Sequence, residues 1–395
     1  MNKYDVCIIG GCGHVGLPLA IVFANKGLKV CIYDIDKKAM EIVNRGKMPF
    51  LEEGAEEMLE KVRGRSLFTT DDPEVISKSK FIVIVIGTPV DEHLNPKFYL
   101  MKNFFKSLLP YFKDGQFIIL RSTVFPGTTE KINELFKSNN LSVYVTYCPE
   151  RIAQGKAIKE LAKLPQIISG FNEKGIKEVT NLFKQITRKI IILEPREAEL
   201  AKLFTNVWRY IQFAIANQFY MIATGYKLDF YKIFDAITYM YPRAKDFPPA
   251  GFAAGPCLFK DTMQVAAFNN NTFFLGHAAM LINEGLPNFL VQRLKDKYSL
   301  QDKTVGILGM SFKANNDDKR ESLSYKLKKL LEIEAKRVLC SDVYINEEGF
   351  VSSRELITDS DIIILATPHK EYVNLDIKDK ILVDVWNFYN RGGLF

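Results

Sequence analysis

The sequence predicts an α/β fold in which two doubly wound parallel-sheet domains are joined by a central helical domain with one long helix. Three features lead to this prediction. Apolar runs of strand length alternate with helical patterns in the N-terminal part of the chain, a proline-free stretch of helical periodicity follows at 196–228, and from residue 303 the early order of runs returns. Such alternation is typical of a parallel sheet with helices on both faces.

The N-terminal part alternates strand and helix. Continuous runs of Val, Ile and Phe predict buried strands, and each is followed by a segment with apolar residues at helical spacing. The predicted strands are 4–11, 29–36, 81–90 and 116–125, and the predicted helices are 15–26, 37–46 and 100–112.

The middle of the chain has a different pattern. Segment 196–228 is much longer than an average helix and is apolar over much of its surface, which is typical of a helix buried between domains or subunits. Further helical sequence is interrupted by a Pro/Gly-rich loop that contains Cys257. We therefore expect three domains, at 1–195, 196–298 and 299–395.

The last domain repeats the order of the first. The runs KTVGILGMSF, RVLCSDVYI, SDIIILATPHK and KILVDVWN follow one another as the early strands do, at similar spacing. The second glycine loop is degenerate, so we expect the two sheets to bind different nucleotides. An α/β domain of unrelated function would show a similar pattern and is the alternative.

Composition excludes several classes of protein. The chain has 395 residues, of which 47% are hydrophobic and 25% charged, as in soluble globular proteins of two or three domains. Its net charge of +7 is spread without a Lys/Arg block, which argues against nucleic acid and suits anionic small molecules. Six scattered cysteines indicate a reduced, cytoplasmic protein, and neither a signal peptide nor a run of membrane-spanning length is evident. Four histidines without ligand spacing predict no metal site.

A GxGxxG motif between a strand and a helix predicts a Rossmann-like dinucleotide site. In this motif the first glycine makes a tight turn, the second admits a pyrophosphate and the third lets helix and strand pack closely. Asp34 ends the next strand, where a carboxylate binds a ribose hydroxyl and repels a 2′-phosphate, so we expect NAD. Lys37 and Lys38 nearby argue weakly for NADP, and a glycine turn without a ligand is the structural alternative. The motif comprises Gly11, Gly13, His14, Val15 and Gly16.

Polar residues follow the strands of this first sheet. Thr88 and Pro89 end one strand and Thr123 ends the next, at the edge where ligands bind in open parallel sheets. Glu150 also follows a strand and is a candidate base, with Arg151 as its partner or as an anion ligand. Helix caps, turns and a solvated ion pair are the alternatives.

The helical middle holds the remaining candidates. Lys202 and Asn206 lie one turn apart on the predicted long helix, where they could polarise a carbonyl or stabilise an alkoxide, although most helix lysines are merely solvated. Asn217 lies further along the same helix. In the loop AGFAAGPCLFKD, Cys257 precedes a lysine and Asp261, and small residues allow a close approach to a ligand.

These pieces together resemble the UDP-glucose/GDP-mannose dehydrogenase family over nearly the whole chain. The motifs that carry the resemblance, in order, are GGCGHVGLPLA, NRGKMPFLEEG, GTPVDE, RSTVFPGTTE, CPERIAQGKAI, EAELAKLFTN, GPCLFKD and SFKANNDDKRES. The resemblance implies an N-terminal NAD domain, a helical middle that forms a homodimer and a C-terminal domain for a UDP-sugar. It implies oxidation of the sugar C6 alcohol to a carboxylate with two NAD+ and a catalytic cysteine.

The resemblance also implies a role for each candidate. It places the nucleophile at Cys257, the oxyanion-stabilising pair at Lys202 and Asn206, and the general base at Glu150. It assigns the water-holding role to Asp261 and Thr123. The remaining cofactor positions are Lys260 and Arg320, and the remaining substrate positions are Arg151, Ile152, Phe252, Gly255 and Lys313, with Lys313 and Arg320 reaching across the domain interface.

The identity of the sugar depends on a few positions. CPER and the segment YPRAKDFPPAGF, with Arg243 as a residue that reaches the partner subunit's substrate, resemble the UDP-N-acetylhexosamine branch (UDP-N-acetylmannosamine or UDP-N-acetylglucosamine). CLFKD resembles the glucose type, and FAAGPC replaces a double glycine with alanines. We therefore expect a UDP-N-acetylhexosamine 6-dehydrogenase for surface-polysaccharide synthesis. UDP-glucose 6-dehydrogenase and a catalytically inactive nucleotide-sugar-binding protein are the alternatives.

Overall fold

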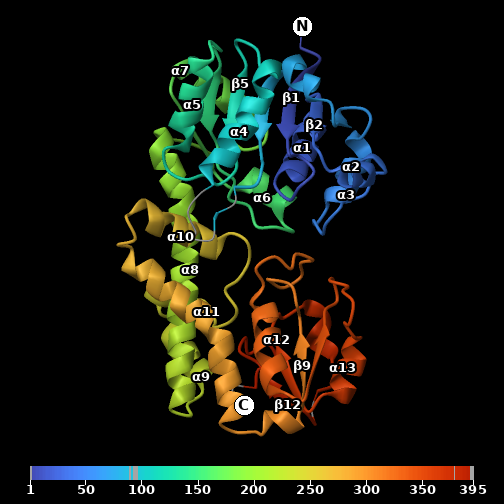
Figure 1. Cartoon of the computed structure of the whole chain (residues 1–395), viewed down its shortest axis with the longest axis vertical. Helices are drawn as coiled ribbons and strands as arrows, with labels where there is room; N and C mark the ends of the chain where they lie inside the picture. The colour runs from blue at the N-terminus through green and yellow to red at the C-terminus, as the bar shows by residue number, and fades with distance from the viewer. Residues whose placement is uncertain (1, 89, 92–96, 378, 392–395) are drawn as a thin grey trace. The chain divides into compact units, whose positions relative to one another are not determined.

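A computed structural model of the chain describes residues 2–88, 90–91, 97–377 and 379–391. The chain forms two compact units, Met1–Phe204 and Thr205–Phe395, and each is described by itself. The boundary falls inside one long helix, α8 (Pro195–Gly225), which begins in the first unit and ends in the second (Figure 1). The three-domain division expected from the sequence remains a prediction.

The first unit is built on one sheet with the strand order β3-β2-β1-β4-β5-β6-β7-β8. Strands β3 to β6 are parallel, as in a dinucleotide-binding sheet, whereas β7 is antiparallel to β6. The strand order reverses between β1 and β4, so a ligand crevice is expected at the carboxyl ends of these strands. The strands are β1 (Tyr4–Ile9), β2 (Val30–Tyr33), β3 (Leu67–Thr70), β4 (Ser79–Ile84), β5 (Phe117–Leu120), β6 (Tyr144–Tyr147), β7 (Gln166–Gly170) and β8 (Ile190–Ile192).

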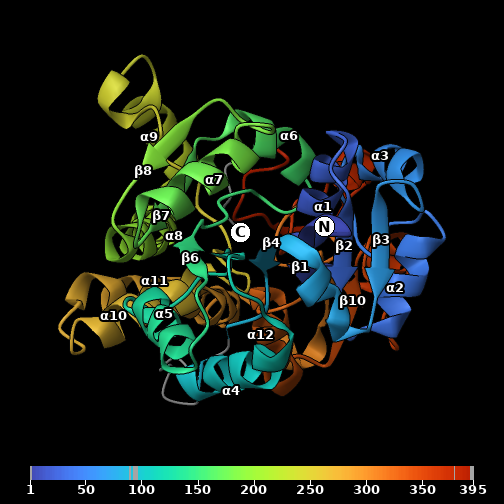
Figure 2. The same cartoon turned by 90° about the horizontal axis from the view of Figure 1, so that it is seen from above.

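Helices cover both faces of this sheet, which explains why its strands are continuous apolar runs (Figure 2). On one face Val6 and Ile8 pack in a core with α1, α3, α6 and α7, and on the other Cys7 and Ile9 pack with α4 and α5. The helices are α1 (Gly16–Asn25), α2 (Lys37–Asn44), α3 (Ala55–Val62), α4 (Phe98–Leu108), α5 (Thr128–Ser138), α6 (Ala157–Lys163) and α7 (Glu173–Phe183), with short 3₁₀ turns η1 (Pro73–Lys78) and η2 (Leu109–Tyr111).

The second unit begins with helices. α8 is followed by α9, whose first turn is capped by the Asp229 carboxylate through the N–H groups of Tyr231 and Lys232. α10 starts directly after Cys257, and α11 packs along α12 of the last domain through Leu290 and Leu327. The elements are α9 (Phe230–Thr238), η3 (Pro242–Ala244), α10 (Leu258–Phe268) and α11 (Phe274–Lys295).

A second parallel sheet, of order β10-β9-β11-β12, completes this unit. Helix α12 covers one face and α13 the other, each with its own apolar core. The strands are β9 (Thr304–Leu308), β10 (Arg337–Ser341), β11 (Ile362–Leu365) and β12 (Ile381–Val383), with α12 (Leu323–Glu334), α13 (Ser353–Asp359), η4 (Leu300–Asp302) and η5 (Lys370–Asn374).

The predicted fold class is therefore confirmed, with two parallel sheets and a helical region between them in sequence. The repeated strand order of residues 303–387 forms the second sheet, and the predicted long helix is α8. Across the described ranges, no helix has both the length and the apolar character that a membrane crossing requires.

Candidate functional site

The glycine loop after β1 has the geometry that the motif requires. A Cβ on Gly16 would lie 2.5 Å from the Gly11 Cα, and one on Gly11 would lie 2.9 Å from the Ile8 carbonyl oxygen, so neither position tolerates a side chain. A Cβ on Gly13 would meet nothing within 4 Å. The open side of the loop therefore lies at Gly13, where the motif admits a pyrophosphate. This arrangement, at the N-terminus of α1, fits NAD.

The residues around the glycine loop hold it in place. Asp34, which directly follows β2, accepts the Cys12 N–H on Oδ2 at 2.8 Å and the Asp36 N–H on Oδ1 at 3.0 Å. The His14 ring stacks on Phe50, with ring centroids 4.0 Å apart. Val15 occupies the N-cap position of α1. Asp34 therefore connects the end of β2 to the loop and stands at the edge of the site expected for a ribose.

The ends of β4 and β5 are tied together by hydroxyl groups. Thr88 Oγ1 donates to the Thr123 carbonyl oxygen at 2.6 Å, and Ser122 Oγ donates to the Ile86 carbonyl oxygen at 2.6 Å. Pro89, which the sequence adds to this group, lies outside the described residues. Thr88 therefore positions the backbone of Thr123 next to the point where the strand order reverses.

Glu150 forms an ion pair with Arg121, which was not among the residues predicted for the site. Its Oε2 accepts from the buried Arg121 guanidinium, and its Oε1 accepts the N–H groups of Arg151 and Ile152 at 2.7 and 2.9 Å. The Arg151 side chain donates instead to the Pro165 carbonyl oxygen. Burial lowers the pKa of the Arg151 guanidinium and outweighs the opposing effect of Glu150. The ion pair of Glu150 is thus made with Arg121, while Arg151 and Ile152 contribute backbone donors.

The first turns of α8 carry two buried charged groups. Glu199 accepts hydrogen bonds from the N–H groups of Gly127 and Thr129 at 2.6 and 2.8 Å, and so caps the N-terminus of α5. Burial raises the pKa of Glu199 despite these bonds. Lys202 is only 8% exposed, and none of the described residues forms a hydrogen bond or ion pair with its ammonium. A buried cation without a partner is costly for folding and is therefore a candidate for ligand binding.

Asn206, the next polar residue on the same face of α8, is hydrogen-bonded to Asp261 on α10. Asn206 Nδ2 donates to Asp261 Oδ2 at 2.5 Å, and both side chains are buried. Asp261 Oδ1 lies 3.7 Å from Lys260 Nζ and, among the described residues, accepts no hydrogen bond. A buried carboxylate oxygen in this state is a natural binding point for a water or a substrate hydroxyl.

Cys257 is exposed, whereas the five other cysteines of the chain are buried. It occupies the N-cap position of α10, where the positive end of the helix dipole stabilises a thiolate. The loop before it is held tightly. Asn217 on α8 donates to the Gly251 carbonyl oxygen at 3.0 Å and accepts the Gly251 N–H at 2.8 Å. Gly255 has φ +105, and a Cβ there would lie 2.5 Å from the Phe312 ring. Asn217 is therefore a clamp for the cysteine loop.

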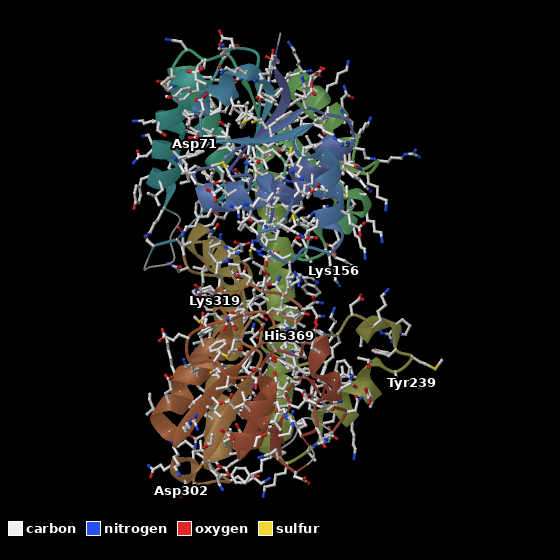
Figure 3. The ribbon with its side chains drawn as sticks, turned by 90° about the vertical axis from the view of Figure 1, so that its right-hand side faces the viewer. Asp71, Lys156, Tyr239, Asp302, Lys319 and His369 are labelled. Carbon is white, nitrogen blue, oxygen red and sulfur yellow. The ribbon has the colours of Figure 1, made fainter. Side chains whose placement is uncertain are left out.

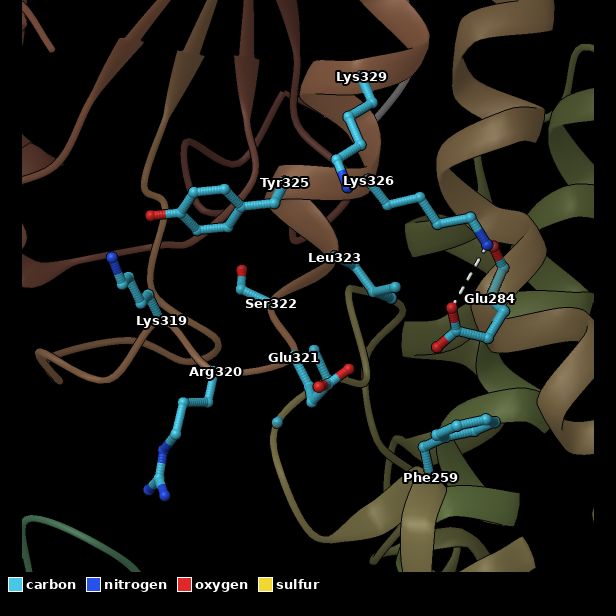
Figure 4. Close-up of a pocket in the computed structure, with 12 residues that line it drawn as sticks. Phe259, Glu284, Lys319, Arg320, Glu321, Ser322, Leu323, Tyr325, Lys326 and Lys329 are labelled. Atoms are coloured by element: carbon cyan, nitrogen blue, oxygen red, sulfur yellow. Dashed lines mark hydrogen bonds and ion pairs between the residues drawn. The ribbon is translucent and has the colours of Figure 1, made fainter. Parts of the chain in front are cut away.

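Beside the cysteine loop, the second unit contains a pocket of about 480 Å³ (Figure 4). Arg320 at its rim is hydrogen-bonded to Asp318 through Nε at 2.9 Å. The pKa of Arg320 is raised, first by its hydrogen bonds to Asp318 and to a lesser extent by Cys257, so the guanidinium lies within electrostatic range of the thiol. Lys326 on the opposite side is paired with Glu284 at 3.3 Å. The lining residues are Ala254, Gly255, Phe259, Glu284, Lys319, Arg320, Glu321, Ser322, Leu323, Tyr325, Lys326 and Lys329.

The remaining predicted substrate residues are less closely grouped. Phe252 is buried within the cysteine loop. Lys313 follows β9, and its ammonium lies 5.7 Å from the centre of the Phe312 ring. Arg243 is exposed in η3, where its Nε donates to the Tyr241 hydroxyl at 2.8 Å.

Three features were not predicted from the sequence: Arg121, the clamp role of Asn217, and the pair Asp342–His369 at the ends of the second sheet. A signal existed for two of them. Arg121 is a lone cation at the end of a continuous apolar run, and RVLCSD aligns Asp342 with Asp34 in KVCIYD. Asn217 carries no such signal.

Comparison with known proteins agrees with this geometry. Three models of the UDP-glucose/GDP-mannose dehydrogenase family match the chain: the NAD binding domain at 4–187, the central domain at 196–284 and the UDP binding domain at 306–391. The chain is 29% identical to a UDP-N-acetyl-D-mannosamine dehydrogenase from Methanocaldococcus jannaschii, over 98% of this chain and 93% of that protein.

Solved structures share the fold. A UDP-D-ManNAc dehydrogenase from Pyrococcus horikoshii has a TM-score of 0.90 at 28% identity and covers 97% of this chain and 96% of its own. A UDP-glucose dehydrogenase from Pyrobaculum islandicum has a TM-score of 0.86 at 24% identity, with coverage of 97% and 94%, which shows the fold alone. The chain therefore belongs to the UDP-glucose/GDP-mannose dehydrogenase family and is an NAD-dependent UDP-sugar dehydrogenase.

Proposed function

We propose that the protein oxidises the C6 alcohol of UDP-N-acetylmannosamine to the uronic acid by way of a thioester on Cys257. The observation that carries the mechanism is the position of Cys257, an exposed thiol at the start of α10 and within range of Arg320, in a chain whose other thiols are buried. The named relatives from Methanocaldococcus jannaschii and Pyrococcus horikoshii support the choice of sugar. We place this activity in the cytoplasm, in the synthesis of surface polysaccharide.

The reaction is a four-electron oxidation. Bound NAD+ supplies the acceptor for both hydrides, so that one alcohol, two NAD+ and one water give one carboxylate, two NADH and three protons. The Cys257 sulfur adds to the C6 carbonyl of the aldehyde and forms a thiohemiacetal. After the second oxidation the same sulfur holds the acyl group as a thioester. Water then adds to the acyl carbon, the C–S bond breaks, and the thiol is restored.

The site residues divide this work. The ammonium of Lys202 and the amide of Asn206 stabilise the oxyanions that form at C6, a role that suits a buried cation without a described partner. Asp261, with one carboxylate oxygen bonded to Asn206 and the other accepting no described hydrogen bond, holds the hydrolytic water. The water-holding role that the resemblance gives Thr123 stays a prediction. Both carboxylate oxygens of Glu150 accept hydrogen bonds, from Arg121 and from two backbone N–H groups, and we assign Glu150 to positioning instead of the general-base role expected from the sequence.

A substrate panel tests the sugar. The full-length protein is incubated with NAD+ and, separately, UDP-N-acetylmannosamine, UDP-N-acetylglucosamine and UDP-glucose, and NADH is followed by absorbance with product masses measured. We expect two NADH per sugar with UDP-N-acetylmannosamine. Turnover of UDP-glucose alone would reject the N-acetyl assignment, and binding of all three without NADH formation would indicate an inactive binding protein.

Substitution of the nucleophile tests the mechanism. Cys257→Ala should stop net uronic acid formation while leaving the affinity for NAD+ unchanged, because the glycine loop belongs to the other unit. Cys340→Ala is the matched control, since this thiol is buried in the second sheet. Uronic acid formed by Cys257→Ala at the normal rate would show that another group is the nucleophile.

We also propose that the protein is a homodimer through α8. One face of this helix exposes apolar side chains, including Trp208 at 60%, with a spacing close to a heptad, and Tyr226, directly after the end of α8, continues the stripe at 77% exposure. A second copy would cover this face. The exposed residues of the stripe are Phe204, Trp208, Ile215, Phe219, Ile222 and Tyr226.

Arg243 supports the same assembly. The neighbouring Tyr239 and Met240 are 77% and 83% exposed. Figure 3 shows Tyr239 at the outer end of the segment after α9. In the dimer Arg243 would reach the partner's substrate. Light scattering should give twice the chain mass for wild type and one chain mass for Trp208→Glu, whereas Arg209→Glu, an exposed polar neighbour, should remain dimeric. A monomeric wild type would refute the assembly.

A further inference from the structure

The carboxyl ends of the second sheet are joined by a buried histidine that the proposed chemistry does not use. His369, labelled in Figure 3, follows β11. It is 0% exposed. Its Nε2 lies 3.1 Å from Asp342 Oδ2, which follows β10, and 3.3 Å from Ser311 Oγ, which follows β9. Its Nδ1 accepts the N–H of Asn315 at 2.9 Å. One ring thus contacts segments that follow three neighbouring strands.

These contacts define the protonation state of the ring. Because Nδ1 accepts a backbone N–H, it carries no proton, so the proton of the neutral ring lies on Nε2 and is donated towards Asp342. Burial raises the pKa of Asp342, but the interaction with His369 and the backbone hydrogen bonds from Tyr344 and Met310 outweigh this effect and lower the pKa. Asp342 is therefore an ionised acceptor for the ring.

The segment that His369 holds is the loop that carries Lys313. Asn315 has φ +55, a left-handed conformation that few residues other than glycine and asparagine adopt. Its N–H binds His369, and its side-chain Oδ1 accepts the N–H of Lys370 at 3.0 Å. On the other side of Lys313, the Ser311 carbonyl oxygen accepts from Thr367 Oγ1 at 2.7 Å. The loop is thus anchored on both sides of Lys313.

The corresponding site in the first sheet has a simpler arrangement. There Asp34 binds the Cys12 N–H, much as Asp342 binds the Met310 N–H at 2.6 Å and the Ser311 N–H at 3.0 Å. In the second sheet Asp342 also accepts hydrogen bonds from His369 and from two further backbone N–H groups. The Asp342 side chain is 0% exposed and interacts with five groups of the protein, so it serves to order the loops and not to bind a ribose.

We infer that His369 is a positioning residue, which holds the loop at Asn315 so that Lys313 meets the diphosphate part of the UDP-sugar. This inference rests on the proposed role of Lys313 as a substrate ligand. Neutral His369 acts through its Nδ1 acceptor, and the bond to Asp342 orients the ring so that Nδ1 faces the Asn315 N–H. His369 itself does not touch the substrate.

Two substitutions separate the two ring nitrogens. His369→Asn can place an oxygen acceptor near the position of Nδ1, whereas His369→Gln can reach the position of Nε2 but offers nothing to Asn315. We measure UDP affinity by calorimetry on the full chain, together with KM and kcat for UDP-N-acetylmannosamine and KM for NAD+. His369→Gln loses the bond to Asn315, so we expect its affinity for UDP to be about tenfold lower than that of wild type. The UDP affinity of His369→Asn should stay within about threefold of wild type.

The kinetic parameters and a double mutant distinguish a loss of loop positioning from general damage to the fold. In His369→Gln the KM for the sugar should rise while kcat and the KM for NAD+ stay within about twofold. Lys313→Met should weaken UDP binding by itself, and His369→Gln should add little in that background, because both act through the same contact. Equal losses in His369→Asn and His369→Gln, or full additivity with Lys313→Met, would overturn the inference.

A second variant, Asn315→Gly, tests the anchoring of the loop if His369→Gln does not fold. Asn315→Gly keeps the backbone N–H and adopts φ +55 freely, but it lacks the side chain that binds Lys370. We expect UDP affinity to fall several-fold, and an unchanged affinity would contradict the proposed anchoring. UDP binding does not depend on turnover, so a wild type that binds UDP but does not oxidise the sugar refutes the proposed function alone. A wild type that does not bind UDP refutes this inference.

Discussion

Removal of the Asn217 side chain should loosen the cysteine loop and destabilise the second unit. Asn217 is 0% exposed and makes three hydrogen bonds, two with the backbone of Gly251 and one, at 2.9 Å, to Asn283 Oδ1. Asn217→Ala leaves the Gly251 N–H, the Gly251 carbonyl and the Asn283 oxygen buried without these partners. Each such group costs about 1–3 kcal/mol, and partial relaxation of the loop reduces the sum, so we expect a loss of about 3–6 kcal/mol. A loss of this size is a large part of the roughly 5–15 kcal/mol that stabilises a typical domain.

Trp386 provides a local probe of this loss. Its ring packs so closely on Gly251 that a Cβ on that glycine would lie 2.3 Å from it. The chain has two tryptophans, so Trp208→Phe leaves Trp386 as the sole tryptophan, whose emission can be excited selectively. Urea unfolding in that background gives the free energy of unfolding for each variant.

Asn269→Ala is the matched control, because the Asn269 side chain is exposed and, within the described ranges, donates only to the nearby Thr272 hydroxyl at 2.9 Å. We expect it to change the free energy of unfolding by less than about 0.5 kcal/mol. If Asn217→Ala also lost less than about 1 kcal/mol, the loop would not depend on the clamp and the reasoning from buried unpaired groups would be refuted.

Two further predictions concern the two sheets. Gly13→Ala should keep wild-type stability but bind NAD+ more than about tenfold more weakly, because its Cβ would stand in the open space where a pyrophosphate approaches. Gly16→Ala should lower the melting temperature, because its Cβ would lie 2.5 Å from the Gly11 Cα. Calorimetry with NAD+ and thermal unfolding separate the two, and equal behaviour would contradict this interpretation of the loop. The lowered pKa of Asp342 means that its carboxylate stabilises the fold above its ordinary pKa of about 3.9 and that this stability is lost as the pH falls through the lower folded-state value. Urea unfolding between pH 6 and acid should therefore show a smaller loss for Asp342→Asn than for wild type, and parallel curves would be inconsistent with the proposed ionisation.

Local patterns in the sequence were sufficient to predict most of the fold. The period of apolar residues distinguished strands such as Tyr4–Ile9 from the long helix Pro195–Gly225, because each period follows directly from backbone geometry. The glycine loop was equally local, since its three glycines and the flanking strand and helix lie within one short stretch. The internal repeat then predicted the second sheet, and the order of motifs led to the family.

Tertiary structure alone decided which of the polar candidates are paired. Glu150 is held by Arg121, which lies 29 residues away in sequence, and the cysteine loop is held by Asn217 at a separation of 34 residues. His369 reaches Asn315 and Ser311 across separations of 54 and 58 residues. Such pairs form because folding brings distant buried polar groups together and each must then find a partner. A short-range pattern carries no information about that partner, so only the packed chain distinguishes a candidate base from one half of an ion pair.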